Sequence, residues 1–136
     1  PVRLGFDVEI LKAEVDAAGY DIVIEANGVM RHIQLKGSFN GSKVYQQGIN
    51  AKLGKKPSGC VVWLGFDAET LNLGPFYWFG GAPGESLPDI SGLKKAKHSK
   101  ANAQGEKTER ANTYVLRRTR CETIGTLDGL IDRLFG

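Results

Sequence analysis

An acid, an amide and an ammonium group fall together at the open end of a predicted β-hairpin. Residues 20–38 are two alternating apolar and polar runs joined by Asn27-Gly28, a pair that favours a two-residue type I′ turn. Counting outward from this turn pairs Asp21 with Gln34. Lys36 lies two residues beyond Gln34 and therefore on the same face of its strand.

These groups suit the chemistry of a hydrated metal ion acting on a phosphate. Mg²⁺ prefers oxygen ligands, and Asp21, Gln34 and the backbone carbonyl of Leu35 would supply them. Lys36 would orient a water nucleophile or stabilise negative charge on the phosphate. The alternative is a plain cross-strand ion pair between Asp21 and Lys36, with Gln34 donating a hydrogen bond to the acid.

The order of these residues resembles the active-site signature of a known nuclease superfamily. Asp21, a short interval and then Gln34-Leu35-Lys36 are similar to the PD-(D/E)xK, restriction-endonuclease-like pattern, in the QxK variant of Mrr-type endonucleases. The similarity covers about residues 9–66 and implies a magnesium- or manganese-dependent DNA endonuclease. Asp21 and Gln34 would bind the metal, and Lys36 would be the catalytic lysine. A catalytically inactive DNA- or protein-binding relative of the same fold is the alternative.

One carboxylate is few for a magnesium site, so the resemblance calls for another acid near Asp21. The candidates are Glu14 first, on the preceding helix, then Asp16 and Glu25. Gln46 or Gln47 stands where some members of the superfamily carry an auxiliary polar residue. His32 lies on the polar face nearer the turn, which indicates a surface or substrate-contacting residue.

The hairpin must be held by a larger sheet. A helix is expected over about residues 9–18, with an extended chain as the alternative, and a second helix over 43–53 capped by Ser42. The continuous apolar run 60–66 predicts a central strand covered on both faces. Further elements are expected at 76–80 (strand), 112–120 (strand) and 126–135 (helix capped by Thr126). This order predicts one α/β (α+β) nuclease-like domain over residues 1–136, with a mixed central β-sheet and flanking helices.

Half of the basic residues gather in one segment. Nine of the eighteen Lys and Arg residues lie between Lys94 and Arg120, against two acids. The Lys-rich stretch near 91–110 predicts a mobile basic loop. Because neutralising backbone phosphates drives DNA affinity, we expect DNA contacts here. The expected contact residues are Lys94, Lys95, Lys97, Lys100, Arg117 and Arg118. A loop that is merely kept in solution by its charge is the alternative.

The remaining composition narrows the class of protein. Cys60 and Cys121 have no CxxC or Cys/His spacing, which disfavours zinc and disulfides and favours a reducing, cytoplasmic location. The longest apolar runs are strand-sized, which argues against a membrane partner. The glycine clusters lack the spacing of a nucleotide-binding loop. The sequence leaves open whether two chains pair as a homodimer to cut both DNA strands.

Overall fold

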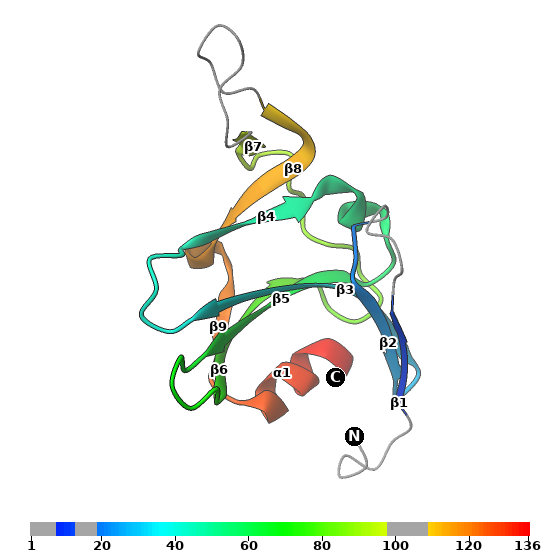
Figure 1. The fold of residues 1–136 in the computed structure, drawn as a ribbon. Coiled ribbons are helices and arrows are strands. Elements are labelled where there is room, and N and C mark those ends of the chain that lie inside the picture. Colours follow the sequence, from blue (N-terminus) through cyan, green and yellow to red (C-terminus); the bar gives the residue numbers. More distant parts are fainter. Residues whose placement is uncertain (1–7, 13–18, 98–108) are drawn as a thin grey trace, which may run out of the picture.

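Two β-sheets and one α-helix stack in three layers in the computed structural model, which describes residues 8–12, 19–97 and 109–136 (Figure 1). A six-stranded mixed sheet forms the middle layer. A three-stranded antiparallel sheet covers one of its faces, and α1 (Leu127–Phe135) covers part of the other. No helix in the described part of the chain is long and apolar enough to cross a membrane.

The six-stranded sheet has the order β1-β2-β3-β5-β6-β9. Its strands are β1 (Val8–Lys12), β2 (Ile22–Ala26), β3 (Val29–Phe39), β5 (Gly59–Phe66), β6 (Leu73–Gly80) and β9 (Glu122–Ile124). All neighbours are antiparallel except β3 and β5, which are parallel. The second sheet has the order β4-β8-β7, with β4 (Gln46–Asn50), β8 (Glu109–Arg117) and β7 (Lys95–Lys97). The described part of the chain also holds two short 3-10 helices, η2 (Ala51–Lys55) and η3 (Arg118–Arg120).

The predicted hairpin is confirmed as β2 and β3. Asn27 and Gly28 have φ values of 51° and 74°, and positive φ at both central residues is what a type I′ turn requires. The pairs Ile22 with Ile33 and Ala26 with Val29 give the register expected from the sequence.

The predicted central strand is also confirmed. In β5, Cys60, Val61 and Trp63 have no solvent exposure and Val62 is 2% exposed. Because successive side chains of a strand point to opposite faces, Cys60 and Val62 join the cluster beneath α1, whereas Val61 joins the cluster between the two sheets. An unbroken apolar run is what a strand covered on both faces needs.

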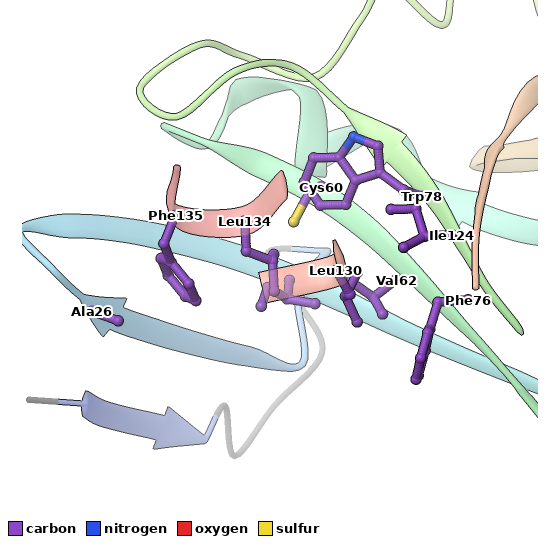
Figure 2. Close-up of a cluster of buried hydrophobic side chains, with 10 residues drawn as sticks. Ala26, Cys60, Val62, Phe76, Trp78, Ile124, Leu130, Leu134 and Phe135 are labelled. Atoms are coloured by element: carbon purple, nitrogen blue, oxygen red, sulfur yellow. The ribbon is translucent and has the colours of Figure 1, made fainter. Parts of the chain in front are cut away.

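The helix packs its apolar stripe on the concave side of the six-stranded sheet (Figure 1). Figure 2 shows Leu130, Leu134 and Phe135 beside residues of the sheet that include Ala26, Cys60, Val62 and Trp78. The predicted cap is present, since Thr126 Oγ1 accepts a hydrogen bond of 3.1 Å from Gly129 N.

A buried arginine fastens the end of this helix to the sheet. Arg31 has no solvent exposure, and its Nε donates to Leu134 O at 2.7 Å. Its Nη2 donates to Gly81 O at 3.0 Å and to Arg133 O at 3.2 Å. Its guanidinium lies 5.0 Å from the ring centre of Trp78. A cation at the carbonyl end of a helix is electrostatically favourable. Arg31 therefore binds the end of α1 to the sheet, at a position of β3 where the alternating pattern would otherwise place an apolar residue.

The expected helix over 43–53 is wrong. This segment forms β4, which pairs with β8, and then η2, which is capped by the Asn50 side chain. Gly48 in the middle of the segment disfavours a helix, and Ile49 is completely buried opposite Tyr114 of β8. Pairing with a distant strand therefore outweighs the local pattern, and the face expected to carry a helix carries a sheet.

The N-terminal expectation and the basic loop are corrected in part. The helix expected over 9–18 is wrong for residues 9–12, which lie in β1 and pair with β2; residues 13–18 lie outside the described residues. Within the expected loop near 91–110, Lys95–Lys97 forms β7 on the edge of the second sheet. Residues 98–108 lie outside the described part of the chain. The α+β class and the mixed central sheet are confirmed, but a pair of flanking helices is not.

Candidate functional site: the hairpin and a basic groove

Asp21 is fixed to the neighbouring strand by its backbone and its side chain. Its N–H donates to Ile33 O at 2.8 Å. Its carboxylate Oδ2 accepts a hydrogen bond of 2.7 Å from Leu35 N. Both contacts follow from the hairpin register, and they hold Asp21 beside Gln34 as the sequence predicts. One of its two carboxylate oxygens is therefore already in use.

Gln34 is enclosed between the two sheets. It is 4% exposed, and it shares its face with Val61 of β5, which belongs to the cluster between the sheets. Its Oε1 accepts a hydrogen bond of 3.4 Å from Asn50 N in β4. The face of the hairpin that the sequence marks as polar is therefore covered at Gln34 by the second sheet.

Lys36 is half-buried on the same side of β3. It makes no ion pair with Asp21; within the described residues, Arg133 and Glu122 form the ion pair that is present. Gln47 Nε2 donates to Gly37 O at 3.3 Å, next to Lys36. Gln47 thus lies near the predicted motif, but on a strand and not on the expected helix.

His32 is held by neighbours at the opposite edge of this region. Its Nδ1 lies 2.7 Å from Pro57 O, and since a carbonyl oxygen accepts, Nδ1 carries a proton. Its ring packs edge-on against Tyr20, with 5.0 Å between ring centres. These contacts give His32 a packing role on the partly exposed side of the hairpin.

The described residues do not complete a magnesium site. Asp21 supplies one carboxylate, and the oxygen of Gln34 faces a backbone N–H instead of an open position. Glu25 is exposed and lies next to the turn, at the far end of β2 from Asp21. In residues 8–12, 19–97 and 109–136 no three His, Cys, Asp or Glu side chains are grouped closely enough to hold a metal. The first two candidate acids, Glu14 and Asp16, lie outside the described residues.

A groove lined by positive charge lies on the second sheet. We call it the basic groove; it has a volume of about 790 Å³. Gln46, Val115 and Arg117 line it from one face of β4 and β8. Ile49 and Leu116 of the same two strands are fully buried on the opposite face. Its cationic lining residues are Lys94, Lys95, Lys97, Arg117 and Arg120, and none of the lining residues that the structure describes is acidic.

The predicted DNA contacts mostly meet in this groove. Four of the six expected residues line it, and Lys100 lies outside the described residues. Arg118 lies next to the groove and lines a second hollow instead. Sequence reasoning missed Arg120 as a single residue, although it belongs to the basic segment. It also missed Tyr45, which lines the groove and is 54% exposed, because that residue was expected within the helix over 43–53.

The second hollow adjoins the basic groove at the end of β8. It has a volume of about 700 Å³, and Thr119 lines both spaces. Arg117 and Arg118 are consecutive residues, yet each lies over a different tyrosine ring. The Arg117 guanidinium is 6.0 Å from the ring centre of Tyr45, and that of Arg118 is 5.4 Å from the ring centre of Tyr77. Two cation–aromatic pairs therefore stand side by side, one in each hollow.

Two backbone hydrogen bonds after the end of β8 hold these arginines in position. Arg118 N donates to Tyr45 O at 2.8 Å, which ties η3 to the residue before β4. Cys121 N donates to Arg118 O at 3.0 Å and closes the turn of η3. Burial raises the pKa of the Cys121 thiol to about 11, so this neighbour of the groove stays neutral at physiological pH.

Comparisons with known proteins add no relative to this picture. No family model, curated protein or solved structure matches the chain.

Proposed function

We propose that this chain binds DNA through the basic groove. The observation that supports the proposal is the meeting of five cationic side chains, with no described acidic residue among them, in one concave space. Phosphate neutralisation by such groups, with release of counterions, supplies most of the affinity of non-specific DNA binding. A polyanion is thus the partner that this charge distribution fits best.

The charges come from two segments that are distant in sequence. Lys94, Lys95 and Lys97 come from β7 and the residue before it, and Arg117 and Arg120 come from the end of β8 and from η3. The pairing of β7 with β8 brings both segments to one surface. Gathering like charges destabilises the folded state through electrostatic repulsion. A bound polyanion would replace this repulsion between the groove's cations by attraction to its phosphates.

Fluorescence anisotropy with a short labelled DNA tests the proposal. We expect log K to fall linearly with the logarithm of salt concentration. Lys95→Ala and Arg117→Ala should each weaken binding several-fold and reduce the salt slope by about one unit. Lys55→Ala is the matched control, because Lys55 is an exposed lysine of η2 outside the groove. Absence of salt-dependent binding, or an equal loss in the control, would contradict DNA binding at this surface.

Metal-dependent DNA hydrolysis, as in PD-(D/E)xK nucleases, is the second candidate function. It is favoured by the hairpin register that sets Asp21 beside Gln34, and by the parallel return from β3 to β5. Lys36 would act on the substrate phosphate, and Asp21 would hold the metal together with an acid such as Glu14. The supporting observation is weaker than for DNA binding, because Gln34 is covered and one described carboxylate is few for Mg²⁺.

Plasmid cleavage separates this candidate from binding alone. The full chain is incubated with supercoiled DNA and Mg²⁺ or Mn²⁺, beside Asp21→Ala, Lys36→Ala and the control Lys55→Ala. A nuclease should lose cleavage in the first two variants and keep it in the control. If none of the four proteins cleaves DNA when Mg²⁺ or Mn²⁺ is present, and all four bind DNA when a chelator is present, the chain is a DNA-binding protein with an inactive hairpin.

A further inference from the structure

The aromatic residue in the basic groove distinguishes this surface from a merely positive one. Tyr45 is 54% exposed, although an aromatic ring gains free energy when it is buried. Its ring lies under the guanidinium of Arg117 at 6.0 Å, and its neighbours in the groove include Lys94 and Lys95. A ring kept open to solvent among phosphate-binding groups is suited to stacking on a base.

A second pair of the same kind continues the surface. Arg118 lies 5.4 Å from the ring centre of Tyr77 in the adjoining hollow. Thr119 lines both the basic groove and this second hollow. The consecutive residues Arg117 and Arg118 thus place one cation in each of two adjacent hollows.

We propose that the basic groove takes single-stranded DNA, with a base stacked on Tyr45 and the strand passing over η3 to Arg118. This inference rests on the proposed DNA-binding function and names the form of DNA. Tyr45 can stack on an unpaired base, whereas the bases of a duplex are already stacked on one another. The groove volume of about 790 Å³ falls within the ~300–1,000 Å³ typical of pockets that hold small ligands, which is enough room for separate nucleotides.

Competition between DNA forms is the first test. A labelled oligothymidylate and a mixed-sequence duplex of the same length are titrated with the full chain at one salt concentration. We expect the single strand to bind more tightly. Tyr45→Ala should weaken single-strand binding about tenfold and leave duplex binding unchanged. Tyr45→Phe should retain single-strand affinity, because the ring that stacks is kept.

Met30→Ala is the matched control for loss of an exposed apolar side chain. Met30 is 46% exposed and lies in β3 next to the hairpin turn, outside the lining of both hollows. The salt slope gives a further check, because Tyr45 carries no charge. Tyr45→Ala should lower the affinity without changing the slope, whereas Lys95→Ala should change both.

The length of the oligonucleotide tests the path over η3. Arg118→Gln should weaken binding of a long oligothymidylate several-fold and leave binding of a short one, which fills the basic groove alone, unchanged. An equal effect at both lengths, or none at either, overturns the path to the second hollow.

The outcomes separate this inference from the function on which it rests. If the duplex binds as tightly as the single strand, or Tyr45→Ala leaves single-strand affinity unchanged, the inference is wrong. DNA binding itself still stands if Lys95→Ala and Arg117→Ala weaken binding of either form. If neither form binds in a salt-dependent manner, the inference and the proposed function both fail.

Discussion

Arg31 and Arg117 make the same kind of contact on opposite sides of the molecule and serve different purposes. Each guanidinium lies over an aromatic ring, at 5.0 Å from Trp78 for Arg31 and 6.0 Å from Tyr45 for Arg117. Arg31 is completely buried and donates to backbone carbonyls of α1 and of Gly81. Arg117 is exposed in the basic groove. Solvent access decides whether the charge supports the fold or is available to a partner.

The buried arginine should give the largest effect. Arg31→Ala leaves a cavity in the layer beneath the sheet and leaves the carbonyls of Arg133 and Leu134 without their donors. We expect the free energy of unfolding to fall by about 3–5 kcal/mol, measured by urea denaturation. Arg31→Lys should be intermediate, because an ammonium cannot reproduce the planar donor set. A loss below about 1 kcal/mol in Arg31→Ala would contradict the role of Arg31 in closing the helix end.

The thiol beneath the helix should make the fold sensitive to alkaline pH. Burial raises the pKa of Cys60 from 9.0 to about 12, although the charge of Arg31 opposes the shift. The unfolded chain therefore releases this proton at lower pH than the folded chain does. The contribution is fully present below pH 9 and is lost as the pH rises toward 12, by up to ~1.4 kcal/mol per pH unit. Denaturation of wild type and Cys60→Ala at several pH values measures it; the variant should show the shallower alkaline loss, and parallel curves would contradict it.

Gln34 tests the region between the sheets. Gln34→Glu introduces a carboxylate into an enclosed site, where we expect a loss of stability of about 1–3 kcal/mol at neutral pH. Because burial would raise the pKa of the new carboxyl, the loss should shrink as the pH falls. The same substitution creates the acidic form of the nuclease motif. A rise in thermal stability on adding Mg²⁺, present in Gln34→Glu and absent in its double variant with Asp21→Ala, would favour the metal site.

The exposed arginine should give the smallest effect on stability. Arg117→Ala removes a side chain that lies in solvent, so its unfolding free energy should stay within about 0.5 kcal/mol of wild type. The same protein sample should bind DNA more weakly. A substantial loss of stability in Arg117→Ala would show that the two arginines are less different than their exposure indicates.

Local patterns predicted the hairpin and the central strand because their causes are local. Asn27-Gly28 fixes the turn, the turn fixes the register, and the register places Asp21 beside Gln34. The unbroken apolar run of β5 likewise predicts, from the residues of that strand alone, that both of its faces are buried. The cap at Thr126 is likewise set by the residues that follow it.

Features that depend on distant strands could not be predicted in this way. Val44, Ile49 and Leu53 fit a helical spacing, but the pairing of β4 with β8 decides the conformation of that segment. Since β4 supplies the residue that covers Gln34, the enclosure of the candidate active site was missed with it. Charge composition pointed to the segment whose basic residues line the groove, whereas the exposure of Tyr45 depends on where β4 begins.

The position of β4 in the chain has a consequence for how the protein folds. It lies between β3 and β5, which are neighbours in the six-stranded sheet, and its own partner β8 begins beyond residue 108. The pairs β3 with β5, β6 with β9 and β4 with β8 therefore join residues far apart in sequence, which slows folding. A chain cut before β8 would leave the edge of β4 unpaired and Ile49 without its partner strand. The groove is for this reason not a separable module, and transplanting it to another protein would require the whole domain.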